Sequence, residues 1–135
     1  MKGVAVGAIG LGLVALVAVE RGDDRSTVAA AVDKLSNVRC FPDEKGRMNL
    51  AAAQAGAAFL LISQFTLAAR LDRGRRPSFE RAAAPEAAAE LLEVLAAGLR
   101  QAGHEVAGGR FGAHMEVELV NDGPVTLILE LPPAV

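Results

Sequence analysis

The strongest constraint on the fold of this 135-residue chain is the uninterrupted apolar run Phe59-Leu60-Leu61-Ile62. A strand that is apolar on both sides needs cover on both faces, so the run predicts a central strand over Ala57–Thr66. This strand ends in the polar group Ser63-Gln64-Phe65-Thr66. Polar side chains at the end of a buried strand are well placed to line a pocket. The alternative is that Ser63 and Thr66 only satisfy backbone groups.

A second stretch, Asn121-Asp122-Gly123-Pro124, separates two strand-like runs, Met115–Val120 and Val125–Leu131. Asn, Asp and Gly are turn residues because they tolerate left-handed backbone, and Pro then fixes its own φ. An X-Pro bond is also the only kind that becomes cis at low cost. The stretch is therefore either a plain hairpin loop or a rigid turn with a function.

Two amphipathic helices are expected, one over Ser26–Asn37 with Ser26 as its N-cap, and a longer one over Pro85–Ala102. Further strands are expected at Val38–Phe41 and within Gly3–Val19, which reads as two buried strands joined by a turn. Strands and helices without a βαβ rhythm predict a single α+β domain over residues 1–135. We expect a largely antiparallel, barrel-like sheet in it.

The net charge of −2 argues against a broad electrostatic grip on nucleic acid, although one small pocket can still hold an RNA end. One cluster of arginines is a candidate phosphate-contacting patch, with a solvated loop as the alternative; it comprises Arg70, Arg73, Arg75, Arg76 and Arg81. Cys40 is the only cysteine, which suits a reducing cytoplasm, and His104 and His114 lack metal-ligand spacing. We therefore expect no metal and no cofactor.

The uncharged run Gly3–Val19 after Met1-Lys2 also resembles a secretory leader, in which case the mature chain would begin near Glu20. The run is shorter than the roughly 20 residues that a membrane span needs. Four glycines interrupt it, and glycine is a poor helix former. Internal strands fit the run better, and we expect no membrane association.

Several motifs occur in the order and spacing of one known family. Ser63–Ala69, Gly74–Phe79 and Gly109–Thr126 resemble consecutive blocks of the D-aminoacyl-tRNA deacylases, and Gly7–Val19 and Phe41–Leu50 are also similar to that family. The resemblance covers most of the chain. In one respect the chain departs from the family, which usually begins with an additional strand. That difference fits either a start site recorded too late or a trimmed variant.

The resemblance implies a homodimeric, cytoplasmic enzyme that hydrolyses the ester between a D-amino acid and the 3′-terminal adenosine of tRNA. It also implies activity on glycine mischarged onto tRNA for alanine. Ser63-Gln64 of one subunit and a cis Gly123-Pro124 of the other would bind the substrate and exclude L-amino acids. Backbone N–H groups of Phe65 and Thr66 would stabilise the oxyanion, and the ribose hydroxyl of the RNA would assist the reaction. Nucleophilic attack by Thr66 is a rival mechanism. The alternative function is a non-catalytic remnant of the fold that binds an RNA end or a protein.

Overall fold

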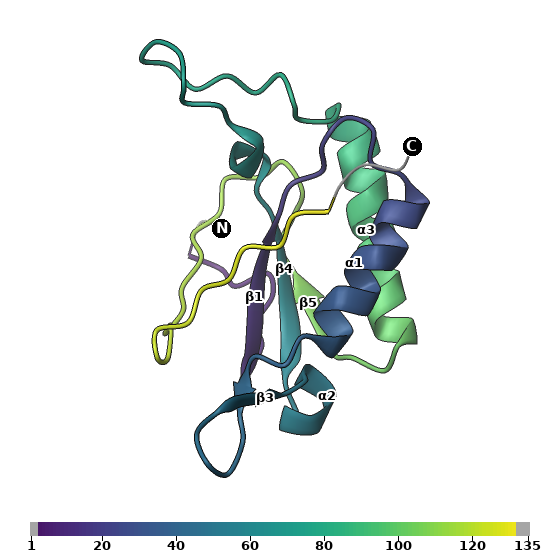
Figure 1. Cartoon of the computed structure of the whole chain (residues 1–135). Helices are drawn as coiled ribbons and strands as arrows, with labels where there is room; N and C mark the ends of the chain where they lie inside the picture. The colour runs from purple at the N-terminus through teal and green to yellow at the C-terminus, as the bar shows by residue number, and fades with distance from the viewer. Residues whose placement is uncertain (1–2, 132–135) are drawn as a thin grey trace.

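The computed structural model describes residues 3–131, so Met1, Lys2 and the last four residues of the expected domain lie outside the described part. Its central sheet has the order β1-β4-β5, and both strand pairs are parallel (Figure 1). A separate antiparallel ribbon joins β2 to β3. The strands are β1 (Gly12–Val17), β2 (Phe41–Pro42), β3 (Met48–Leu50), β4 (Ala58–Ser63) and β5 (Val106–Gly108).

The helices explain why the sheet is parallel. Helix α1 (Arg25–Asn37) lies in the connection from β1 to β4, and α3 (Pro85–Gln101) lies in the connection from β4 to β5. Both helices cover the same face of the sheet and pack on each other (Figure 1). Parallel neighbours need such long crossovers, whereas a hairpin joins antiparallel strands. The α+β class and the two amphipathic helices are therefore confirmed. The antiparallel prediction is wrong for the central sheet, and barrel closure is not seen within residues 3–131.

The core forms where β4 meets α3. Phe59 and Leu99 are fully buried, and Leu61 and Leu95 are nearly so. Burying a side chain of this size contributes about 1.5–3 kcal/mol to stability, so these contacts hold β4 against α3. The two helices approach closely at Gly98, where a Cβ atom would lie 2.7 Å from a methyl carbon of Val32. A larger residue at Gly98 would therefore push α1 away from α3.

The expected two strands within Gly3–Val19 are reduced to β1, because the segment before Gly12 carries no strand. Strand β4 stops at Ser63, and the chain then forms a short 3₁₀ helix, η1 (Phe65–Ala68). A one-turn helix, α2 (Ala52–Ala55), precedes β4. Neither short helix was expected from the sequence. No helix within residues 3–131 combines the length and apolarity that a membrane crossing requires.

The expected hairpin of Met115–Val120 and Val125–Leu131 is wrong for the isolated chain, because neither run pairs as a regular strand. Both runs leave large apolar side chains in solvent, and Val120 and Ile128 are 90% and 88% exposed. Alternating apolar residues are typical of a half-buried strand. Within residues 3–131 of a single chain, the apolar side chains of these two runs do not pack against the core.

Helix α1 begins one residue earlier than expected, and its N-cap is Asp24 rather than Ser26. The Asp24 carboxylate accepts hydrogen bonds from the backbone N–H groups of Ser26 and Thr27, and the Thr27 hydroxyl accepts one from the Asp24 N–H. This reciprocal pair is a capping box. The Ser26 hydroxyl also donates to the carboxylate, and this bond is the largest cause of the lowered pKa of Asp24.

We expect Asp24→Ala to lower the melting temperature by about 3–5 °C at neutral pH, because α1 loses its cap. The native pKa of Asp24 lies below its usual 3.8, so the carboxylate stabilises the fold above that pH. This contribution is lost as the pH falls through the native pKa. Asp24→Asn is the matched control, since it keeps an acceptor that does not titrate. Thermal melts between pH 3 and 7 should show wild type and Asp24→Asn converging at the acidic end. Equal melting temperatures for wild type and Asp24→Ala at pH 7 would contradict this role.

Candidate functional site

The end of β4 turns sharply into η1. Gln64 donates its backbone N–H to the carbonyl of Val17 at 2.8 Å, which keeps the chain on the sheet as far as this residue. Its backbone then adopts φ −144° and ψ 75°, and η1 begins at Phe65. The expected strand over Ala57–Thr66 is therefore too long. Phe65 and Thr66 lie beyond the sheet on an exposed turn, while Ser63 and Gln64 are half-buried.

The turn presents backbone donors to solvent. The first hydrogen bond of η1 runs from the Leu67 N–H to the carbonyl of Gln64 at 3.1 Å, so η1 itself supplies no acceptor for the N–H groups of Phe65 or Thr66. The Phe65 side chain is 56% exposed. Backbone N–H groups without an acceptor in the helix can donate to a negatively charged oxygen. The arrangement can therefore stabilise an anion or a developing oxyanion.

The Thr66 hydroxyl has a specific neighbour, since the side-chain amide of Gln64 donates a hydrogen bond to its Oγ1. An amide N–H is a donor and cannot remove the proton of a hydroxyl. A threonine nucleophile needs an adjacent base. The contact therefore orients the Thr66 side chain without activating it.

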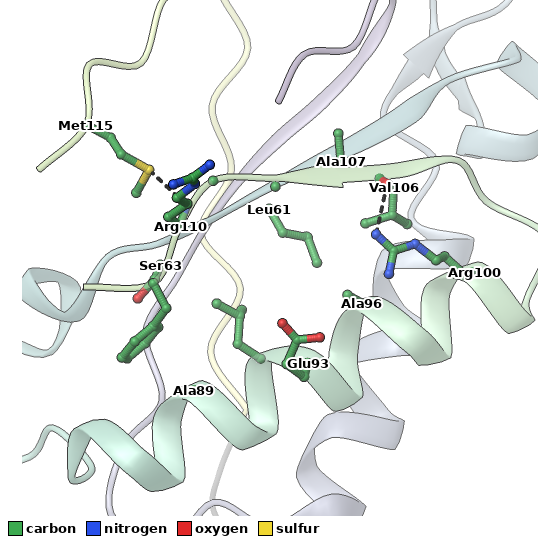
Figure 2. A pocket seen from close by; sticks show the side chains of 14 residues that line it. Leu61, Ser63, Ala89, Glu93, Ala96, Arg100, Val106, Ala107, Arg110 and Met115 are labelled. Carbon is green, nitrogen blue, oxygen red and sulfur yellow. Dashed lines mark hydrogen bonds between the residues drawn. The ribbon is translucent and has the colours of Figure 1, made fainter. Parts of the chain in front are cut away.

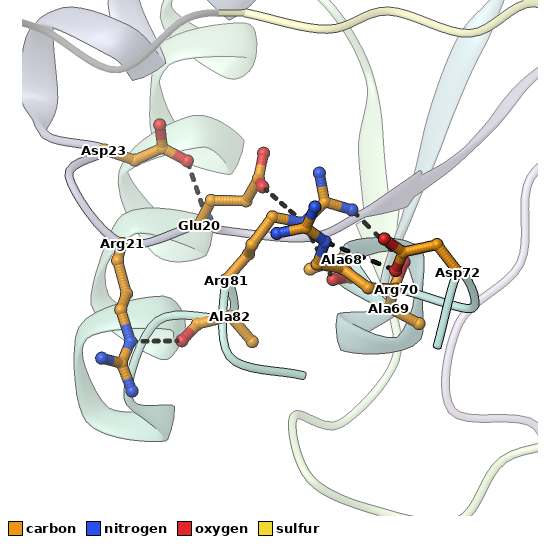
Figure 3. A network of polar contacts seen from close by, with 9 residues as sticks. All are labelled: Glu20, Arg21, Asp23, Ala68, Ala69, Arg70, Asp72, Arg81 and Ala82. Atoms are coloured by element: carbon orange, nitrogen blue, oxygen red, sulfur yellow. Dashed lines mark hydrogen bonds and ion pairs between the residues drawn. The ribbon is translucent and has the colours of Figure 1, made fainter. Parts of the chain in front are cut away.

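The base of the loop that follows η1 packs on the site. The rings of Phe65 and Phe79 meet edge to face with centroids 5.1 Å apart. Arg81 donates to the carbonyls of Ala68 and Ala69 at 3.3 Å each and pairs with Glu20 at 3.7 Å (Figure 3). One arginine side chain thus joins η1 to the segment after β1, and η1 is held on both of its sides.

A cavity of about 330 Å³ opens beside this end of the sheet, between β5 and α3 (Figure 2). Ser63 and Arg110 line it on the sheet side, and Glu93 and Arg100 line it on the helix side. Arg100 donates to the carbonyl of Val106 at 3.1 Å. Of the expected site residues only Ser63 reaches this cavity, so the cavity adjoins the candidate site and does not contain it.

The peptide bond Gly123-Pro124 is cis, and Gly123 has φ +139°. The side chain of Asn121 braces this turn from both ends. Its Oδ1 accepts from the Val125 N–H and its Nδ2 donates to the Thr126 hydroxyl, each at 2.9 Å. Asn121 and Thr126 lie within the turn motif, but their part in bracing it was not predicted. The sequence signal for this bracing was an amide side chain before the Gly-Pro pair and a hydroxyl side chain after it.

The structure does not bring this turn to η1 within one chain. The tight turn of the yellow-green C-terminal segment lies at the lower left of Figure 1, whereas η1 is the short teal helix beyond the upper end of β4. Gly123 and Pro124 are both exposed. Ser63, Gln64, Phe65 and Thr66 therefore form one cluster, and Gly123-Pro124 forms a second, separate one.

The two histidines lie outside both clusters. The Nε2 atom of His104 lies 3.0 Å from the Ser36 hydroxyl on α1, and its ring packs edge to face on Phe59. His114 is exposed. Residues 3–131 contain no group of three side chains that could hold a metal ion.

Comparison with known proteins gives a consistent result. The family model described as D-Tyr-tRNA(Tyr) deacylase matches residues 1–130. A protein named D-aminoacyl-tRNA deacylase from Azotobacter vinelandii is 56% identical over 130 residues, which are 96% of this chain and 90% of that protein. One of the same name from Methylococcus capsulatus is 51% identical, over 98% of this chain and 87% of that protein.

Two solved structures share the fold. One, titled c-Myc DNA Unwinding Element Binding Protein, superposes with a TM-score of 0.86 at 33% identity and covers 92% of this chain and 85% of its own. The other, a probable eukaryotic D-amino acid tRNA deacylase, gives 0.62 at 15% identity and covers 75% and 74%, which speaks for the fold alone. The family model and the curated relatives each span nearly all of the sequence, and the matched region includes Ser63 and Gly123. The chain belongs to the D-Tyr-tRNA(Tyr) deacylase family.

Proposed function

We propose that this chain, as one domain over residues 1–135, hydrolyses the ester between a D-amino acid and the 3′ end of tRNA. The observation that carries the proposal is the match over 130 residues at 56% identity to a protein named D-aminoacyl-tRNA deacylase. The chain is thus a hydrolase of translation quality control. A cytoplasmic location follows as part of the proposal, because charged tRNA is used where translation takes place.

Residues at the end of β4 bind the substrate in this proposal. Ser63 and Gln64 contact the terminal adenosine and the ester, and the N–H groups of Phe65 and Thr66 donate to the oxyanion that forms on the ester carbonyl. Their exposure ahead of the first hydrogen bond of η1 supports this role. The bond from Gln64 to Thr66 supports a backbone role for Thr66 over a nucleophilic one. The ribose hydroxyl of the RNA is then the group left to assist the reaction.

The second half of the site comes from another copy of the chain. Gly123-Pro124 lies away from η1 of its own chain, and the runs on either side of it expose apolar side chains such as Val120 and Ile128. Exposed apolar patches mark interaction surfaces. A two-fold dimer would cover them and bring each turn to the partner's η1, because both copies present the same surface.

The turn then selects the stereochemistry. In this arrangement the backbone of Gly123-Pro124 stands beside the α-carbon of the bound amino acid. An L side chain would point into it, whereas a D side chain, or the hydrogen of glycine, would point away. Selectivity arises by exclusion of the wrong isomer. The bracing of the turn by Asn121 favours this role, since a screen must keep its shape.

Release of D-tyrosine from D-Tyr-tRNA is the decisive assay, with L-Tyr-tRNA as the matched control substrate. We expect hydrolysis of the D-ester and of Gly-tRNA, and little of the L-ester. Light scattering should report a dimer in the same preparation. A folded dimer that releases nothing above background would refute the enzyme. Binding of uncharged tRNA or of a protein by that inactive dimer would then favour the non-catalytic remnant.

Gly123→Ala should lower kcat/KM on D-Tyr-tRNA by at least about tenfold. At φ +139° an L residue is strained, and its Cβ would lie 2.9 Å from a methyl carbon of Val125, so the turn must change shape. Gly46→Ala is the matched control, because Gly46 also has a positive φ of +77° but belongs to the β2–β3 turn. An unchanged rate for Gly123→Ala would count against the cross-subunit site.

A further inference from the structure

The loop from Arg70 to Arg81, here called the basic loop, carries most of the positive charge near the candidate site. It holds five arginines and two acidic residues, so its net charge is +3 in a chain whose net charge is −2. The arginines are Arg70, Arg73, Arg75, Arg76 and Arg81, and the acids are Asp72 and Glu80. Such a local excess of one sign favours a partner of the opposite sign.

The base of the basic loop is well ordered by its contacts. Arg70 and Ser78 exchange two backbone hydrogen bonds of 2.7 and 2.9 Å, which close the loop. Arg81 binds the carbonyls of η1, and Phe79 packs on Phe65 of the candidate site (Figure 3 shows the arginine contacts). The loop is therefore anchored directly to the residues that receive the aminoacyl end of the substrate.

The arginines of the basic loop differ in whether their guanidinium groups have partners within the chain. Arg81 is engaged with Glu20 and two carbonyls, and Arg70 lies 3.8 Å from the Asp72 carboxylate. At the tip, Arg73, Arg75 and Arg76 are exposed, and within residues 3–131 they have no hydrogen bond or ion pair. Three guanidinium groups close in sequence repel one another unless an anion lies between them. The positive charges at the tip are therefore available to a bound anion.

We propose that the tip of the basic loop binds phosphates of the tRNA acceptor end, next to the terminal adenosine held at Ser63–Thr66. The proposal rests on the proposed function for its choice of RNA. Only three residues separate Thr66 from Arg70, so the strand that delivers the ester to η1 must pass the root of this loop. Arginine binds phosphate through paired N–H groups, which a lysine does not offer. The loop lets an acidic protein hold tRNA at one place and distinguishes tRNA from small esters.

The test uses the double variant Arg75→Gln/Arg76→Gln and two substrates, D-Tyr-tRNA and D-tyrosyl-adenosine, which carries the ester without phosphates. On D-Tyr-tRNA in low salt, kcat/KM should fall by about tenfold. The slope of log(kcat/KM) against the logarithm of the salt concentration should become less negative by about 1–2. On D-tyrosyl-adenosine the rate should stay within about twofold, because the η1 contacts are intact. The matched control is Lys45→Gln/Arg47→Gln, which removes the same charge from the β2–β3 turn at the opposite end of the molecule (Figure 1).

Two results would overturn the proposal: an unchanged rate on D-Tyr-tRNA, or equal losses on both substrates, which would place the effect in the fold of the site. If wild type hydrolyses neither substrate, the proposed function fails while the loop is still testable. Fluorescence anisotropy with labelled, uncharged tRNA then decides. About tenfold weaker binding by the double variant, with the control unchanged, supports the loop. Equal binding by all three proteins, or no binding by wild type, refutes it.

Discussion

Replacing Phe65 by proline should reduce kcat on D-aminoacyl-tRNA by about 10²–10³-fold more than replacing it by alanine. Proline removes the backbone N–H that we assign to the oxyanion, whereas alanine keeps this donor and removes only the ring. Loss of one such donor costs about 3–4 kcal/mol of transition-state stabilisation. The comparison of the two variants therefore isolates a backbone group that side-chain substitution cannot reach.

The local geometry permits this substitution. Phe65 is the first residue of η1, a position where proline fits because its N–H has no intrahelical acceptor. Gln64 before it has φ −144° and ψ 75°, which lies outside the helical region that a following proline disfavours. Single-turnover kinetics would separate the chemical step from binding, and thermal melts would check the fold. Equal rates for the two variants would show that the backbone N–H of Phe65 does not stabilise the oxyanion.

Mixing two inactive variants should restore activity if each site takes residues from both subunits. One variant, Phe65→Pro, lacks the donor at η1; the other, Gly123→Val, cannot keep the turn at φ +139° because a β-branched residue is strongly disfavoured there. In a mixed dimer, both defects meet in one site and the other site is intact. Random exchange at equal amounts should therefore recover about one quarter of the wild-type rate.

The complementation experiment carries its own control. Mixing Gly123→Val with Gly123→Ala should restore no wild-type site, because both changes affect the same half. Mild denaturation and refolding together ensures subunit exchange, and light scattering confirms the dimer. If the Phe65→Pro and Gly123→Val mixture is no more active than its components, the site lies within one subunit and the dimer model is wrong.

The elements with strong repetitive patterns could be predicted from the sequence. The apolar run Phe59–Ile62 indicated the central strand, and the spacing of leucines after Pro85 indicated α3 to within one residue at its C-terminal end. These patterns reflect burial, which acts over several residues at once. Burial of Phe59 at 0% exposure confirms this interpretation.

Short-range chemistry was predicted less well. Strand β5 (Val106–Gly108) has too few residues for a pattern, so the crossover through α3 and the parallel pairing went unrecognised. Asp24 and Ser26 are both good caps, and only the hydrogen bonds show that Asp24 takes the role. Apolar residues continue past the end of β4 into η1, so the sequence pattern does not show that the strand stops at Ser63. The residues around Gly123 predicted either a plain hairpin loop or a rigid turn, and the bracing by Asn121 that distinguishes the two depends on side-chain geometry.

The uncovered C-terminal segment has a consequence for how the cell handles this protein. A newly synthesised chain displays Val120, Ile128 and their apolar neighbours, and under the dimer model it does so until it meets a second copy. Chaperones and proteases recognise such surfaces, so chains that have not paired are bound or degraded first. Under the dimer model, the residues that complete the reaction centre also act as a maturation signal. The supply of active molecules would then depend on how quickly sister chains find each other after leaving the ribosome.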